Sequence, residues 1–217
     1  MPTQRSAQRA VVHRTKPEHG AQTKAELVAV ARELFALRGH AGVALKEVSD
    51  RAKVTRGALY HHFPGKDSLF RAVCEQVAEE VSQRLIARAA REPTAWARLE
   101  AGCLAFLDEC ARPDVRQILL TDAPAVLGWE AFRELDGRHG LGLLKAGLQS
   151  AIDEGAVAPL PPDTMAHMLV AALNEAGMVV ARAKDPQAAR QEAVLSIRRL
   201  LAGIAGPDRA ASRRRDR

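Results

Sequence analysis

The residues with the clearest chemistry lie between Lys53 and Lys66, a stretch that carries no carboxylate. Its polar groups are a hydroxyl, a guanidinium, a phenol and two imidazoles, beside a glycine that allows close backbone approach. Donors of this kind contact phosphates and base edges in nucleic acids. The candidate nucleic-acid contacts are therefore Thr55, Arg56, Gly57, Tyr60, His61, His62 and Lys66, with Lys46 just before them.

Two short helices and a tight turn are predicted over residues 45–66 to hold this set. Apolar residues at helical spacings form the inward face, namely Leu45, Val48, Ala52, Val54, Ala58 and Leu59. In a helix-turn-helix the first helix braces against the backbone while the second enters the major groove. An ordinary helical hairpin with a solvated face has the same periodicity. The cluster of outward donors favours the nucleic-acid interpretation over this alternative.

The charge of the chain is concentrated beside this stretch. The 217 residues have a formal net charge of +6, and residues 1–68 hold 12 Lys and Arg against 6 Asp and Glu. Residues 69–205 hold 15 against 18, whereas residues 206–217 hold 5 against 2. A small basic module on a nearly neutral body is typical of nucleic-acid binding.

The cysteines and the hydropathy pattern indicate a cytoplasmic protein. Cys74, Cys103 and Cys110 have no paired spacing, and an odd number without a secretory signal favours a reducing compartment. No window of eighteen residues is wholly apolar, so no membrane span is expected. We expect no metal, no cofactor and no catalytic residue, because phosphate loops, nucleophile elbows and metal-ligand clusters are lacking.

A preceding helix buttresses the pair. Thr23 and Glu26 have the spacing of a capping box, and Gly39 is the expected end of that helix. Residues 1–20 are interpreted as a disordered basic arm, residues 21–68 as the DNA-binding domain, residues 69–205 as a helical domain and residues 206–217 as a disordered basic tail.

The runs TKAELVAVARELFALRG and LKEVSDRAKVTRGALYHHFPGKDSLF resemble the DNA-binding domain of TetR-type transcriptional repressors over residues 23–70. The resemblance implies that Thr55, Arg56 and Gly57 enter the groove. It also implies that Tyr60 and His62 contact phosphates and base edges, and that Lys66 holds a phosphate. Two departures from the family pattern stand out. Val43 and Ala44 cannot cap the second helix as Thr or Ser would, and Lys53 occupies a turn position that usually carries Gly.

The rest of the chain is predicted to be helical, giving an all-α fold of about nine helices. Helices are expected over residues 67–92 and 94–112, then as two short pieces separated by Pro124, where Asp122 is expected to act as a helix cap. A stretch to Ile152 contains weakening glycines, and residues 155–162 form a linker. The last two helices are predicted over about residues 162–183 and 186–204.

By resemblance, these last two helices form a homodimer that reads a palindromic DNA operator, and the C-terminal domain binds a small-molecule effector that releases the DNA. Candidate pocket residues are Cys103, Phe106, Cys110, Trp129, Phe132 and Asn174, although each also suits an ordinary core. Two other classes stay open: an all-α enzyme, and a helical adaptor that binds a protein through its basic head. Steep salt dependence would favour DNA binding over both.

Overall fold

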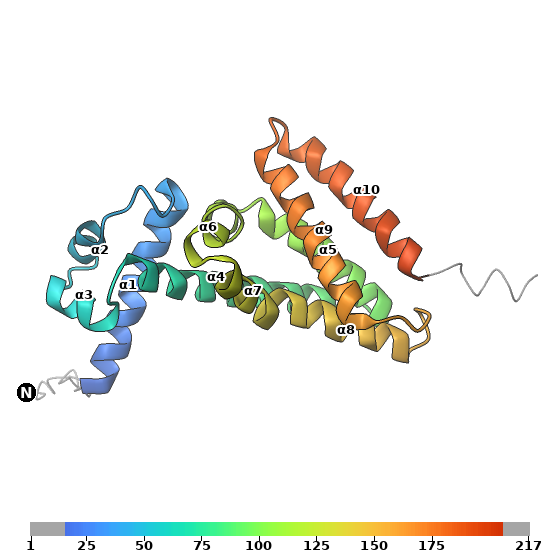
Figure 1. Cartoon of the computed structure of the whole chain (residues 1–217), viewed down its shortest axis with the longest axis horizontal. Coiled ribbons are helices and arrows are strands. Elements are labelled where there is room, and N and C mark those ends of the chain that lie inside the picture. The colour runs from blue at the N-terminus through green and yellow to red at the C-terminus, as the bar shows by residue number, and fades with distance from the viewer. Residues whose placement is uncertain (1–15, 206–217) are drawn as a thin grey trace, which may run out of the picture.

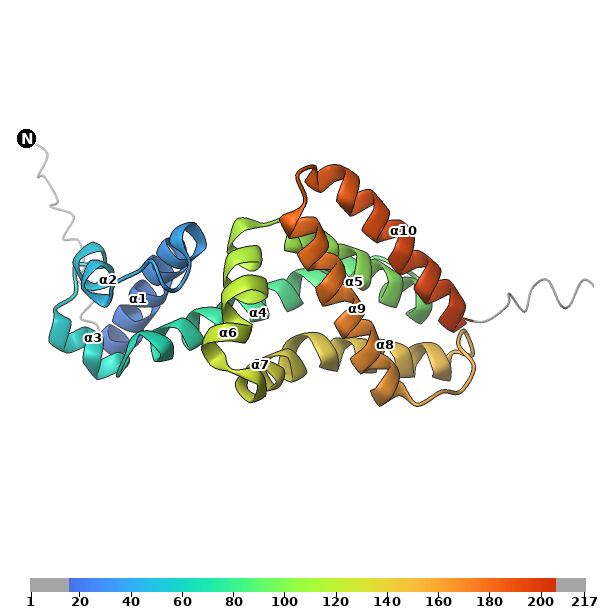
Figure 2. The ribbon, with the colours of Figure 1, turned by 45° about the horizontal axis from the view of Figure 1, so that its top comes forward.

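The computed structural model describes residues 16–205, which form helices and no strand (Figure 1). The all-α prediction is confirmed. Three helices within residues 16–62 form a head at one end, and the last two helices, α9 (Pro162–Arg182) and α10 (Pro186–Ala205), lie side by side at the far end of the body (Figures 1 and 2). Helix α4 (Lys66–Ala89) runs from the head into the body and connects the two.

The head comprises α1 (Lys16–Arg38), α2 (Leu45–Arg51) and α3 (Arg56–His62). Helix α1 begins within the predicted arm, so residues 16–20 are helical and the capping box at Thr23 is wrong. Pro17 suits the first turn, where the missing N–H has no intrahelical partner anyway. The helix ends as predicted at Gly39, whose φ of 69° is easy for glycine. The remaining arm and the predicted tail lie outside the described residues.

Helices α4 (Lys66–Ala89) and α5 (Ala95–Cys110) form the spine of the molecule. The apolar residues predicted at intervals of four along α4 are buried from Leu69 to Val81, and Leu85 is half-buried. The Thr94 hydroxyl caps α5 by accepting a hydrogen bond from the Ala97 N–H at 3.2 Å. One face of α5 is buried in the core through Leu99, Cys103 and Leu107.

The middle of the body differs from the prediction. A π-helix, η1 (Val115–Asp122), continues into α6 (Ala123–Leu127), α7 (Trp129–Asp136), a second π-helix η2 (Gly137–Leu141) and α8 (Gly142–Asp153). The break between the short helices is at Gly128, with a φ of 77°, and not at Pro124. Pro124 lies in the first turn of α6, where proline is tolerated.

The last two helices are α9 (Pro162–Arg182) and α10 (Pro186–Ala205), close to their predicted bounds. By length and composition alone α9 could cross a membrane, contrary to the expectation from its sequence. It is nevertheless packed against α5, α8 and α10, and it buries Leu169, Val170, Leu173 and Val180 in the core of the body. That packing accounts for part of its apolar composition, since 33% of the apolar window is buried.

The head and the body share a hydrophobic core. Phe35 of α1, Leu59 of α3 and Phe70 of α4 belong to the same buried cluster as Val115 and Ile118 of η1. A second cluster unites α5, α8, α9 and α10. Because buried clusters transmit displacement, a change at η1 can reach the head through packed side chains.

Candidate nucleic-acid interface and internal cavity

The helix pair of the head is built by local interactions. The Thr55 hydroxyl caps α3 by accepting a hydrogen bond from the Ala58 N–H at 3.2 Å. Helix α2 begins after Ala44 without a side-chain cap, as its sequence predicts. Between the helices Lys53 has a φ of 55°, a left-handed conformation that glycine adopts more easily. The turn geometry is thus kept despite the absence of the usual glycine.

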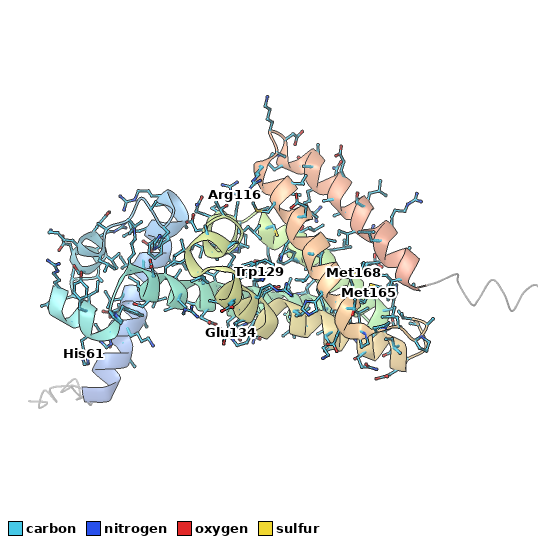
Figure 3. The ribbon with its side chains drawn as sticks, in the orientation of Figure 1. His61, Arg116, Trp129, Glu134, Met165 and Met168 are labelled. Atoms are coloured by element: carbon cyan, nitrogen blue, oxygen red, sulfur yellow. The ribbon has the colours of Figure 1, made fainter. Side chains whose placement is uncertain are left out.

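The predicted contact residues are brought together on the outside of this pair. Lys46, Thr55, Arg56, Gly57, Tyr60 and His61 are exposed, whereas His62 and Lys66 are half-buried. Figure 3 shows His61 on the head, far from the labelled α9 residues. The Arg56 guanidinium lies over the Tyr60 ring, 5.4 Å from its centroid, and has no carboxylate partner within residues 16–205. Lys46 pairs with Asp50 at 2.8 Å on the same exposed surface.

A hollow of about 200 Å³ separates the exposed edges of α2 and α3. It is lined by Leu45, Lys46, Ser49, Arg56, Leu59 and Tyr60. Lysine, arginine and tyrosine donors surround the hollow, which makes it suitable for an anionic oxygen.

Lys66 makes hydrogen bonds within the head that the sequence did not predict. Its ammonium donates to the backbone carbonyl oxygens of His40, at 2.9 Å, and Val43, at 3.2 Å. These bonds hold the loop before the uncapped start of α2. Two of the three ammonium donors are therefore occupied, and one is left for the phosphate contact that remains a prediction.

The joint between head and body was missed by sequence reasoning. The His40 N–H donates to Asp122 Oδ2 at 2.7 Å, and the Gln117 amide donates to Asp122 Oδ1 at 3.1 Å. Asp122 was expected to cap a helix, but its side chain makes no cap hydrogen bond and holds the head instead. Burial, followed by the nearby Lys66 charge, lowers the pKa of His40.

A second tie joins the same two regions. Arg32 of α1 bridges Glu80 of α4 at 2.7 Å and Asp114, next to η1, at 2.6 Å. Hydrogen bonds from Arg32 lower the pKa of Glu80. These residues are too far apart in the sequence for any periodicity to associate them.

The body contains two adjoining cavities, of about 160 and 70 Å³. The larger lies among α4, α5, α8 and α9, and the smaller extends toward η1 and α7. Both are lined by Leu85, Phe106, Asp136, Gly140 and Asn174, so they meet at these residues. Apolar walls with few polar groups are typical of small-molecule sites.

The predicted pocket residues divide into three groups. Cys103, Phe106 and Asn174 line the larger cavity, and Phe132 lines the smaller one. Cys110 lines neither and packs against Gly177, where an added Cβ would lie 2.6 Å from the Cys110 sulfur. Trp129 also lines neither, being 72% exposed on α7 (Figure 3). Cys110 is thus part of the core, and Trp129 lies on the surface.

Asp136 is the main lining residue that the sequence did not identify. Its Oδ2 atom is buried and has no hydrogen-bond partner within the described residues. Burial raises the pKa of this carboxyl, opposed by the charges of Arg133 and His167. A carboxylate among charged neighbours in AFRELDGRHG looks solvated in sequence, so no local pattern could have identified it.

The cysteine thiols of α5 are unreactive. Burial raises the pKa of Cys103 and of Cys110 to about 12, which keeps both thiols protonated. Among residues 16–205, no group of three or more His, Cys, Asp or Glu side chains is placed to hold a metal ion.

Comparison with known proteins gives matches along most of the chain. The family model described as bacterial regulatory proteins, tetR family, matches residues 27–73, and the tetracyclin repressor-like C-terminal domain matches residues 96–204. The transposon Tn10 TetC protein of Escherichia coli is 26% identical over 152 residues, which are 70% of this chain and 77% of that protein.

Two further similarities cover the head and the whole fold. The probable acrEF/envCD operon repressor of Escherichia coli K12 is 36% identical over 83 residues, 37% of each chain. The crystal structure of a TetR-family transcriptional regulator from Pectobacterium atrosepticum has a TM-score of 0.77 and 32% identity. That match covers 89% of this chain and 99% of the other.

Proposed function

Because the chain belongs to the TetR family and is a DNA-binding transcriptional regulator, we propose that it is a homodimeric repressor released from a palindromic operator by a small molecule. The proteins it resembles are regulators, and no catalytic role is proposed. The division into residues 21–68 for DNA and residues 69–205 for effector and dimer is part of the proposal. A cytoplasmic location follows, since the operator lies on bacterial DNA.

One observation carries the DNA-binding proposal. Helix α3 exposes Arg56 and Tyr60 without a carboxylate partner in the described residues, while Leu59 is buried beneath them. A guanidinium held over a phenol ring is restricted in its motion, so less entropy is lost when it contacts a base or phosphate. Gly57 and His61 complete the face that would meet the groove.

Exposed apolar residues on the last two helices support the dimer. Met168 and Val179 of α9 are 62% and 53% exposed, and Leu195 and Leu200 of α10 are 60% and 51% exposed. Contact with a second copy would remove these side chains from water. A dimer is also needed because one short recognition helix reads few bases, and two heads about 34 Å apart would read two half-sites.

The route from effector to DNA is proposed to run through η1. Val115, Leu119 and Leu120 of this π-helix line the smaller cavity. The same element ends in Asp122, which holds the His40 N–H of the head. A ligand that displaces η1 would therefore change the position of the head relative to the body.

Footprinting tests the DNA proposal. Purified protein is applied to the DNA that flanks its own gene, and protection of two half-sites about one helical turn apart is expected. Arg56→Ala should change which sequences are preferred, because arginine donors read base edges. Tyr60→Phe should weaken binding to all sequences. No protected site, together with unchanged affinities for both variants, would refute DNA reading by α3.

Sedimentation tests the dimer. The double substitution Met168→Asp and Val179→Asp places charges on the proposed interface and should convert a micromolar dimer to monomer. Leu37→Asp is the matched control, since Leu37 is 78% exposed on α1, away from α9 and α10. A wild-type monomer at micromolar concentration would contradict the palindrome model.

A further inference from the structure

Two polar side chains lie on the wall that the two cavities share. Three of the five residues that line both cavities are apolar or glycine, namely Leu85, Phe106 and Gly140. Asp136, from the end of α7, and Asn174, from the middle of α9, are the polar exceptions. A ligand that fills either cavity would therefore contact both side chains.

One oxygen of Asp136 is left without a hydrogen bond by the part of the protein that the structure describes. Asp136 Oδ2 is buried without a hydrogen bond in residues 16–205, and the Nη1 atom of Arg133 lies 3.7 Å away. The other terminal nitrogen of Arg133 is hydrogen-bonded to His167 Nδ1. Asn174 is half-buried on the same wall. Buried polar groups are normally paired, because leaving one unpaired costs about 1–3 kcal/mol.

The cavity offers little to an anionic ligand. Arg98 is the cation that lines the larger cavity, and its guanidinium already donates to the carbonyl oxygens of Glu92, at 3.0 Å, and Pro93, at 2.8 Å. His139 lines the smaller cavity, and its ring nitrogens lie 3.3 and 3.4 Å from Glu75 and Glu79. An acid placed here would meet the Asp136 carboxyl on the wall that the two cavities share.

The cavity volumes limit the size of the apolar part. A protein cavity of about 150 Å³ is large enough to bind benzene. Adjoining spaces of about 160 and 70 Å³ therefore suit a body of one or two rings.

We propose that the effector is a compact apolar molecule of one or two rings that carries a hydroxyl or amino donor, and that Asp136 selects it by accepting a hydrogen bond from that donor. Asn174 supplies a second polar contact. The inference deepens the proposed function, since it names the chemical class of the effector in the same body. It also predicts that carboxylic acids of the same shape are rejected.

Binding of four matched probes tests this proposal. The probes are 2-methylnaphthalene, 2-naphthol, 2-naphthylmethylamine and 2-naphthoate, and their dissociation constants are measured by calorimetry on the full-length protein. The naphthol and the amine should bind about tenfold tighter than the hydrocarbon, because a hydrogen bond to a charged group supplies that difference. The naphthoate should bind more weakly than the hydrocarbon.

Two variants separate selection from simple filling of space. Asp136→Asn keeps the size of the side chain and should reduce the advantage of the amine over the hydrocarbon by about tenfold. Gly102→Leu should weaken the binding of all four probes alike. Gly102 lines the larger cavity and an added Cβ there meets no atom within 4 Å, so the new side chain would occupy the cavity itself. Unchanged hydrocarbon affinity in Asp136→Asn shows that the cavity is still folded.

Three results would overturn the proposal. They are binding of no probe, equal affinity of the wild-type protein for all four, and an advantage of the amine that survives Asp136→Asn. Operator affinity is measured separately on the probe-free protein. Probe selection without operator binding would refute the proposed function and keep this inference, whereas operator binding without probe selection would do the reverse.

Discussion

The DNA-reading face and the internal cavity place polar groups in opposite surroundings. On α3, Arg56, Tyr60 and His61 are exposed to water, which hydrates them until a partner arrives. In the body, Asp136 is half-buried beside apolar walls, and its buried Oδ2 has no hydrogen bond within the described residues. The exposed groups of α3 cost the free protein little stability, because water hydrates them. The unpaired oxygen of Asp136 lowers the stability of the free protein until a ligand supplies the missing donor.

This difference also determines how each region discriminates. Exposed cations attract any polyanion, so affinity at the reading face depends strongly on salt, and sequence preference comes from a few base contacts. A buried carboxyl is poorly screened, so one unsatisfied oxygen can reject an entire ligand class. The head should therefore be sensitive to charge, and the cavity to hydrogen bonding and shape.

The largest expected effect comes from removing the support beneath the reading face. Leu59→Ala deletes a side chain that is 1% exposed under α3 and should cost about 2–5 kcal/mol of stability. Operator affinity should be lost with it, since α3 then lacks its anchor. Denaturant unfolding and fluorescence anisotropy on operator DNA measure the two effects.

Leu148→Ala is the matched control for Leu59→Ala. Leu148 is fully buried in the core of the body, so the same deletion should cost a similar amount of stability. Operator affinity should persist at temperatures where the variant is folded. If Leu148→Ala lost as much operator affinity as Leu59→Ala, the loss would not be due to the support that Leu59 gives to α3.

The next effect is at the joint between the two regions. Asp122→Ala removes the acceptor of the His40 N–H and should destabilise the protein by about 1–3 kcal/mol. The His40 amide should also exchange its hydrogen faster. Asp122→Asn retains an acceptor oxygen and should restore part of the protection. Unchanged exchange in Asp122→Ala would remove this residue from the proposed route.

Much of the head could be predicted from the sequence because its determinants are local. The inward spacing of Val48 and Leu59 and the end of α1 at Gly39 each depend on a few neighbouring residues. The start of α1 was wrong because Thr23 and Glu26 have capping spacing inside a helix that had already begun.

The joint and the cavity could not be predicted for the opposite reason. Arg32 meets Asp114, and His40 meets Asp122, only because the chain folds back across α4. Asp136 acquires its altered pKa from burial by distant elements. The helical pattern predicted the layers of the body, but no local spacing specifies which polar side chains meet between them.

A smaller effect compares two lysines of the head. Lys46 has an 83% exposed side chain, so Lys46→Ala should lower the salt slope of operator binding by about one. Lys66→Ala should weaken binding through loss of the loop contacts to His40 and Val43, with a smaller change in slope. Anisotropy titrations at several salt concentrations measure both slopes. A full unit of change in Lys66→Ala would instead assign its remaining donor to a phosphate.

The smallest effect compares two glycines, one in each region. An added Cβ meets no atom within 4 Å at Gly57 of α3 or at Gly102 of α5, and both residues are helical. Alanine at either position should therefore stabilise the protein by about 0.5–1 kcal/mol, as thermal unfolding can measure. Only Gly57→Ala should weaken operator binding, because the new methyl group then separates α3 from the DNA backbone. If the Gly57→Ala variant were more stable and kept full operator affinity, the close approach of α3 to the DNA backbone would be refuted. The gain in stability would show that the fold itself does not require glycine at this position.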